Sequence, residues 1–142
     1  MIDGYRGPAG AHVPVLKVGD VLLVTLHGEL HDKAAEQLQQ DIGEAIARSS
    51  AAGVVIDVSG VEIVDSFLGR VFAEIAANAR LLAAQTVVAG MRPAVAITLV
   101  ELGLTLPGLR TALDTDEALR MLTRASASTP PLSPGPGRQE NA

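Results

Sequence analysis

The chain has 142 residues, of which 48% are hydrophobic and 19% charged, so it is large and apolar enough for one domain with a real core. Aromatic residues make up only 2%, and the net charge is −5, which together argue against binding nucleic acid through stacking or phosphate contacts. The absence of cysteine excludes disulfides and thiolate metal sites. No apolar stretch approaches the length of a membrane span, and the N-terminus lacks the apolar core of a signal peptide. We therefore expect a cytoplasmic protein that has no membrane partner.

The two ends of the chain differ in composition from the middle. Residues 1–12 are glycine-rich and aperiodic, and residues 125–142 are rich in proline, serine and glycine. Such a tail cannot bury enough apolar surface to offset the entropy lost on ordering. We therefore predict a folded domain over residues 13–124, with a flexible N-terminus before it and a disordered tail after it.

Strand-like and helix-like patterns alternate within residues 13–124. Short apolar runs predict strands, and apolar residues spaced three or four positions apart predict helices. In chain order the pattern predicts strands at 13–18 and 21–26, a helix from Asp32, a strand at 54–56, a helix from Ser66 to Leu82, a strand at 86–89, a helix at 93–102, a strand at 109–113 and a helix at 114–122. This order predicts an α/β fold in which helices pack against a mixed sheet, and its first two strands should form a hairpin across Gly19-Asp20.

Three of these elements show further features. Asp32 is the expected N-cap of its helix. Val54 to Ile56 are apolar at consecutive positions, which is typical of a strand buried on both faces. The helix PAVAITLVELGL is apolar around its whole circumference, so it is either deeply packed in its own domain or docked against another copy or a partner.

The candidates for catalytic or metal chemistry are few. The segment His27-Gly-Glu-Leu-His31 holds two histidines and a carboxylate, but a zinc site would need a further well-placed ligand, and the segment reads more simply as the end of a strand and the start of a helix. Asp57 and Asp65 read as turn and cap residues. No phosphate-binding loop, nucleophile elbow or nucleophile–base pair is visible, so we expect no enzyme, no catalytic residue, no cofactor and no metal.

Asp65-Ser66 stands directly behind the predicted strand and in front of the next helix. Both residue types are favoured helix caps, and capping alone is the simplest interpretation of Ser66. A phosphate on Ser66 would, however, face free backbone N–H groups and the positive end of the helix dipole, so the folded domain could hold it. Ser66 is therefore a candidate phosphorylation site as well as a candidate cap.

Three separate blocks of the sequence resemble a known family. The stretch GVVIDVSGVEIVDSFLGRV resembles the signature of STAS domains, the fold of the anti-sigma-factor antagonists. The blocks VPVLKVGDVLLVTLHGELHD and VVAGMRPAVAITLVELGL are similar to the small STAS-only scaffold subunits of bacterial stressosomes, the RsbS type. The resemblance implies a STAS fold, with a mixed four- to five-stranded sheet and about four helices, and no enzymatic activity.

The resemblance also implies a regulatory cycle. In the stressosome branch, the serine that opens the second main helix is phosphorylated by a switch serine kinase of the histidine-kinase-like ATPase superfamily, and Ser66 holds that position. The unphosphorylated chain would hold the kinase, and phosphorylation would release it into a stress-response sigma-factor pathway. A PP2C-type phosphatase would reset the serine, and larger STAS sensor paralogues would co-assemble with the self-associating scaffold.

The expected docking surface of the kinase surrounds Ser66. It comprises the exposed end of the helix and the turn beside it: Ser59, Gly60, Asp65, Phe67 and Leu68.

Two other functions remain open. The chain could be a simple anti-sigma-factor antagonist that uses the same serine to regulate an anti-sigma kinase. Antagonists usually have serine and glycine after the phosphorylated serine, whereas Phe67-Leu68-Gly69 follow here, which favours the stressosome branch. The loop Gly28-Glu29-Leu30-His31 also departs from the usual Gly-Glu-Leu-Asp. A small-molecule-binding or catalytic α/β domain is the third alternative, but the sequence gives no sign of the polar pocket it needs.

Overall fold

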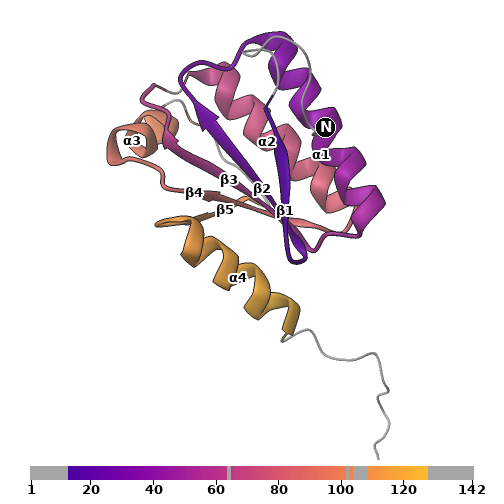
Figure 1. The fold of residues 1–142 in the computed structure, drawn as a ribbon. Coiled ribbons are helices and arrows are strands. Elements are labelled where there is room, and N and C mark those ends of the chain that lie inside the picture. Colours follow the sequence, from indigo (N-terminus) through magenta and orange to yellow (C-terminus); the bar gives the residue numbers. More distant parts are fainter. Residues whose placement is uncertain (1–12, 64, 102, 104–108, 128–142) are drawn as a thin grey trace, which may run out of the picture.

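The computed structural model describes residues 13–63, 65–101, 103 and 109–127. Within these residues, strands and helices alternate in the predicted order (Figure 1). The elements are β1 (Val15–Val18), β2 (Val21–His27), α1 (Asp32–Ser49), β3 (Gly53–Gly60), α2 (Ser66–Leu81), β4 (Gln85–Ala89), α3 (Pro93–Glu101), β5 (Leu109–Ala112) and α4 (Thr115–Ala127). The predicted α/β fold is confirmed.

The five strands form one mixed sheet in the order β1-β2-β3-β4-β5. β1 and β2 pair antiparallel as the predicted hairpin, and the turn between them places Gly19 at a φ of 61°, a value that glycine adopts readily. The remaining neighbours, from β2 to β5, pair in parallel. Parallel pairing brings the carboxyl ends of β2, β3 and β4 to the same edge of the sheet, which is where the candidate site lies.

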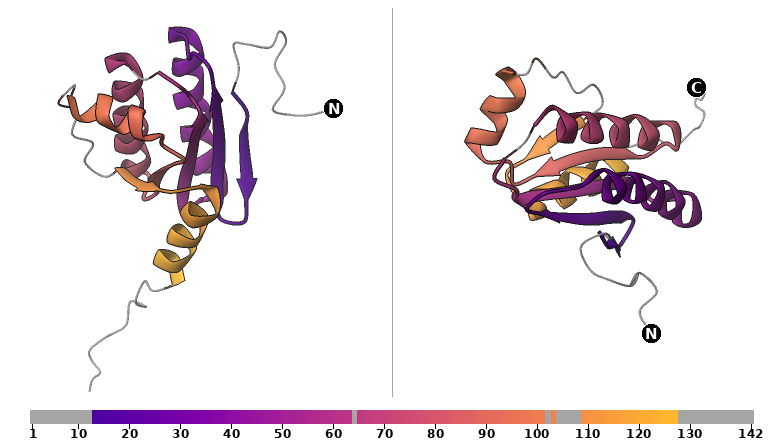
Figure 2. Two further views of the ribbon diagram at one scale, coloured as in Figure 1. Left: turned by 90° about the vertical axis from the view of Figure 1, so that its left-hand side faces the viewer. Right: turned by 90° about the horizontal axis from the view of Figure 1, so that it is seen from above.

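Helices cover both faces of the sheet. α1 and α2 pack against each other on one face, while α4 lies on the opposite face against β3, β4 and β5 (Figures 1 and 2). α3 lies beyond the carboxyl ends of the strands rather than on either face (Figure 1). None of the helices in the described residues has both the length and the apolar character needed to cross a membrane.

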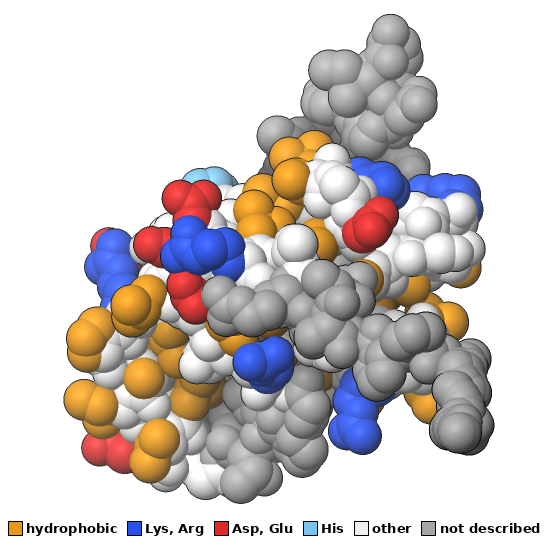
Figure 3. All heavy atoms as spheres, turned by 90° about the horizontal axis from the view of Figure 1, so that it is seen from below, with side chains coloured by type: hydrophobic (Ala, Val, Ile, Leu, Met, Phe, Trp, Pro, Cys, Tyr) orange, Lys and Arg blue, Asp and Glu red, His pale blue; other side chains and the backbone are white. Residues whose placement is uncertain are grey.

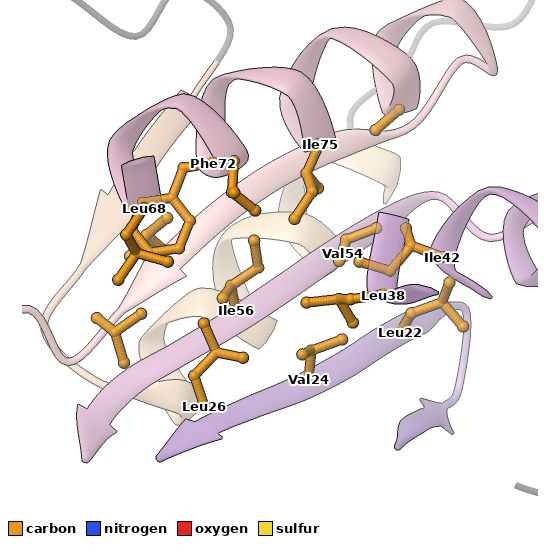
Figure 4. Packing of buried hydrophobic residues seen from close by; sticks show 14 of the residues in the cluster. Leu22, Val24, Leu26, Leu38, Ile42, Val54, Ile56, Leu68, Phe72 and Ile75 are labelled. Atoms are coloured by element: carbon orange, nitrogen blue, oxygen red, sulfur yellow. The ribbon is translucent and has the colours of Figure 1, made fainter. Parts of the chain in front are cut away.

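The core has two parts, one on each side of the sheet. The larger part fills the space between the sheet and α1 and α2, where Ile56 of β3 lies among side chains from β2 and both helices (Figure 4). The smaller part lies beneath α4 and includes Val55 and Leu122. Alternate residues of β3 therefore enter the two parts, which confirms the prediction that this strand is buried on both faces.

α3 is not deeply packed, so that alternative for its apolar sequence is wrong. Only Val95 and Leu99 are buried, whereas Ile97 is 57% and Val100 77% exposed. Because α3 lies past the end of the sheet, a single stripe of the helix contacts the domain and its other side faces solvent. Seen from below, the molecule shows such exposed hydrophobic side chains in separate groups with charged residues between them (Figure 3).

The structure corrects one boundary in each of two helices. α1 begins at Asp32, so its N-cap is His31, whose side chain makes no capping hydrogen bond, and the predicted cap at Asp32 is wrong by one position. α4 continues past the predicted end at Leu122 to Ala127, so the first three residues of the predicted tail are helical. The predicted flexible N-terminus (1–12) and the rest of the predicted tail (128–142) lie outside the described residues.

Candidate functional site

The carboxyl ends of β2 and β3 come together very closely. The Gly28 backbone N–H donates to the Gly60 carbonyl oxygen at 3.3 Å. A β-carbon on Gly60 would lie only 2.9 Å from Nδ1 of His27 and 3.2 Å from the carbonyl oxygen of Leu26. Only glycine fits there without moving a neighbour. Glycine as the last residue of β3 therefore allows the two strand ends to approach this closely.

A side-chain hydrogen bond lies within the same end of β3. Asp57 accepts a hydrogen bond from the Ser59 backbone N–H at 2.9 Å through Oδ1, but both residues lie within β3, so the predictions of Asp57 as a turn residue and of a turn at Ser59 and Gly60 are wrong. Gly90, at the end of β4, has a φ of 76°, and a β-carbon there would lie 3.0 Å from the β-carbon of Ser59. The residue that follows β4 thus lies close against the end of β3. Ser59 and Gly60 are both exposed, as a docking surface requires.

Asp65 and Ser66 have different roles at the start of α2. Asp65 is the N-cap: its backbone is extended, and Oδ1 accepts a hydrogen bond from the Leu68 backbone N–H at 3.0 Å. Ser66 is the first helical residue and is exposed, and no side chain or backbone group of the described residues hydrogen-bonds to its hydroxyl. The cap predicted for Asp65 is confirmed, whereas Ser66 does not cap this helix.

The next two residues anchor the helix start. Leu68 is only 6% exposed and Phe67 is half-buried against the same core. Leu68 and Phe72 point from α2 toward the strands (Figure 4). Placing Leu68 on the exposed end of the helix was therefore wrong, because its side chain belongs to the buried stripe. These contacts fix the first turn of α2 and hold Ser66 at the surface.

A groove of about 1010 Å³ runs beside this helix start. One side is formed by residues 28–33, which connect β2 to α1. The other side is formed by the connection from β3 to α2 and the first turn of α2: Gly60, Glu62, Ile63, Asp65, Phe67 and Leu68. The groove brings together four of the predicted docking residues, while Ser59 and Ser66 do not line it.

Residues 28–33 were not predicted as part of any docking surface. The segment from His27 to His31 was interpreted as the end of a strand and the start of a helix, which is confirmed by β2 ending at His27 and α1 beginning at Asp32. The parallel order of β2 and β3 is the signal that could have found them, because it places both outgoing loops at one edge of the sheet. No group of three potential metal ligands occurs among the residues that the structure describes.

Curated relatives of this chain come from Bacillus subtilis (strain 168). RsbT co-antagonist protein RsbRD is 27% identical over 107 residues, which cover 75% of this chain and 38% of that protein. RsbT co-antagonist protein RsbRA is 26% identical over 112 residues, or 72% of this chain and 40% of that protein. The chain thus spans about two fifths of the length of the curated relatives it matches.

Solved structures give a closer match over almost their full length. A serine-to-glutamate variant of RsbS from Moorella thermoacetica is 40% identical, with a TM-score of 0.72, and the match covers 81% of this chain and 97% of that one. A chain from a structure described as the molecular architecture of the stressosome, a signal integration and transduction hub, is 42% identical with a TM-score of 0.71, covering 80% and 98%. The anti-sigma factor antagonist SpoIIAA, at 18% identity and a TM-score of 0.60, shares the fold.

The family model of the STAS domain matches residues 12–118, which include all five strands and the first three helices. The five-stranded mixed sheet, its helices and the match to RsbS agree with this assignment. The chain belongs to the STAS domain family.

Proposed function

We propose that the chain is a stressosome scaffold and regulatory protein that sequesters a switch serine kinase and releases it when Ser66 is phosphorylated. The observation that carries this proposal is an exposed serine at the start of a helix whose cap is supplied by its neighbour, Asp65. Identities of 40% and 42% to RsbS and to a stressosome chain support the same branch. The protein acts in the cytoplasm by binding and not by catalysis.

The position of Ser66 suits a reversible phosphate. The first backbone N–H groups of a helix lack intrahelical partners, and the helix dipole is positive there, so both stabilise an added anion. Because Ser66 is exposed and its hydroxyl bonds to no described residue, a phosphate would displace no hydrogen bond among the residues that the structure describes. The domain would therefore stay folded while its surface gained a charge of about −1.5 to −2.

Release of the kinase requires only a modest change in free energy. A hundredfold loss of affinity corresponds to about 2.8 kcal/mol. A phosphate that loses water against an acidic or apolar part of the kinase would supply this penalty. The kinase would contact Ser59, Gly60, Asp65 and Phe67 around Ser66. The buried Leu68 would keep the first turn of α2 in place beneath these residues.

The scaffold role needs further partners. The relatives RsbRD and RsbRA are longer than this chain and are named as co-antagonists, so we propose that such larger STAS paralogues co-assemble with it. A PP2C-type phosphatase would remove the phosphate from Ser66 and restore kinase binding.

Mass spectrometry after incubation with the cognate switch kinase and ATP tests the proposal. We expect one phosphate on the wild type and on Ser50→Gly, which removes an exposed serine at the end of α1, outside the proposed kinase surface, and none on Ser66→Ala. The Ser66→Ala protein should also retain the kinase under phosphorylating conditions. If Ser66→Ala is phosphorylated, or still releases the kinase with ATP, the proposed switch is wrong.

A further inference from the structure

The groove beside Ser66 combines an apolar floor with a charged rim. Leu68 is buried at its base, Leu30 and Phe67 are half-buried, and Ile63 at the rim is 81% exposed. An exposed isoleucine next to partly covered apolar side chains offers apolar area that a bound chain segment could remove from water.

The rim is acidic. Four exposed carboxylates, from Glu29, Asp32, Glu62 and Asp65, line the groove together with one lysine, Lys33, so the lining has a net charge of −3 with His31 neutral. Asp65 uses Oδ1 for its capping bond. Within the part of the chain that the structure describes, no ion pair compensates Glu29, Asp32 or Glu62.

We infer that this groove binds a basic segment of the partner kinase, with an apolar side chain against Ile63 and Phe67 and with lysine or arginine facing the carboxylates. The inference rests on the proposed function and adds the β2–α1 connection, above all Glu29, to the docking surface. A wholly apolar segment would strip water from four carboxylates without pairing them, and an acidic one would be repelled. The sign of the charge also excludes an anionic membrane or a nucleic acid as the occupant.

The acidic groove constrains how phosphorylation releases the kinase. A phosphate on Ser66 makes this end of the molecule more negative, which by itself would strengthen the attraction for a basic segment. Release must therefore come from a local clash or desolvation at Ser66, which lies outside the groove lining. The basic segment and the part of the kinase that faces Ser66 are accordingly different parts of its surface.

Kinase binding by charge-neutral variants tests the inference. The double variant Glu29→Gln with Glu62→Gln should bind the cognate kinase at least about tenfold more weakly than the wild type at low ionic strength. Most of this loss should come from a slower association rate. Added salt should weaken the binding of the double variant less than it weakens the binding of the wild type. The control, Glu44→Gln with Asp116→Asn, removes the same charge from exposed positions outside the groove on α1 and α4, and should bind like the wild type. Equal affinities of the two double variants, or tighter binding by Glu29→Gln with Glu62→Gln, would overturn the inference and leave the Ser66 switch intact.

A second measurement does not depend on the kinase. A synthetic peptide of alternating leucine and lysine, titrated into the ¹⁵N-labelled full chain, should shift the amide signals of Glu29, Ile63 and Phe67, and its leucine–glutamate counterpart should not. Shifts that spread instead over the acidic start of α4, at Asp114 and Asp116, would overturn the inference. If the kinase fails to bind the wild type while the lysine peptide marks the groove, the proposed function is wrong and the groove chemistry stands.

Discussion

Asp65 and Ser66 are adjacent in the sequence but differ in what their side chains contact. The Asp65 carboxylate accepts a hydrogen bond from the Leu68 backbone N–H, whereas Ser66, the first residue of α2, is exposed and does not cap the helix. Because the cap is independent of Ser66, modification of the serine does not remove a hydrogen bond on which the helix depends. The fold and the proposed switch are thus separated at the level of single side chains.

Ser66→Asp is expected to imitate phosphorylation only in part. It adds one negative charge where a phosphate adds about −1.5 to −2, so kinase affinity should fall, but by less than on phosphorylation of the wild type. Ser66→Asn has the same shape without the charge and should bind almost as the wild type does. Isothermal titration calorimetry with the cognate kinase measures all three; an equal loss for the aspartate and asparagine variants would point to shape rather than charge.

Asp65→Ala is expected to destabilise the domain by about 1 kcal/mol, because the Leu68 backbone N–H loses its acceptor at the helix start. Asp65→Asn retains an acceptor oxygen in the same place and should lose only a fraction of that amount. Urea unfolding followed by circular dichroism checks both changes. Equal losses for the two variants would contradict the capping role.

At the scale of elements, the site depends on how the strand ends meet. β2, β3 and β4 run parallel, so their outgoing loops lie together, and Gly60 and Gly90 allow the backbones to approach closely. The β3–α2 connection then leads directly into the anchored first turn of α2. The two walls of the groove come from connections that are far apart in the sequence and adjacent only in the sheet.

Gly60→Ala is expected to destabilise the domain by about 1–3 kcal/mol, because the new methyl group would overlap the His27 ring and press on the Leu26 carbonyl oxygen. Gly43→Ala is the matched control: this glycine lies inside α1 with nothing near the added carbon, so the change should stabilise by about 1 kcal/mol. Thermal unfolding of both variants and of Gly60→Ala with His27→Ala separates the causes. The double variant should recover only part of the loss, since the carbonyl contact remains.

For the whole molecule, apolar surface remains exposed in several places. Leu16 and Val18 lie on the edge strand β1, Ile97 and Val100 on α3, and Leu81 at the end of α2. Single exposed apolar residues are normal in monomeric proteins, but several groups on one small domain fit a subunit that is covered on more than one side in an assembly.

Particle size is expected to distinguish a stressosome scaffold from a simple anti-sigma-factor antagonist. Co-expressed with a larger STAS paralogue, the chain should elute in a megadalton-scale particle, as judged by size-exclusion chromatography with light scattering. The chain without a paralogue provides the reference. A small species of monomer or dimer size in both samples would favour the antagonist.

The order of strands and helices followed from the sequence, because hydrophobic period is a local property that each segment reveals by itself. The length of β3 was underestimated, because the prediction covered only residues 54–56. Asp57 and Ser59 interrupt the apolar run, although both belong to the strand. The start of α2 was placed correctly at Ser66, but both Asp65 and Ser66 were candidates for the cap. Their roles depend on backbone geometry that residue type alone does not specify.

The sequence by itself determined the element order, the mixed sheet and the serine at a helix start, because periodicity, turns and capping preferences act over a few residues. Only the tertiary structure decided that residues 28–33 face the first turn of α2 across an acidic groove, that Leu68 is buried and that one side of α3 is exposed. These features depend on which elements become neighbours. Packing between segments distant in the chain sets that choice, and no local pattern encodes it.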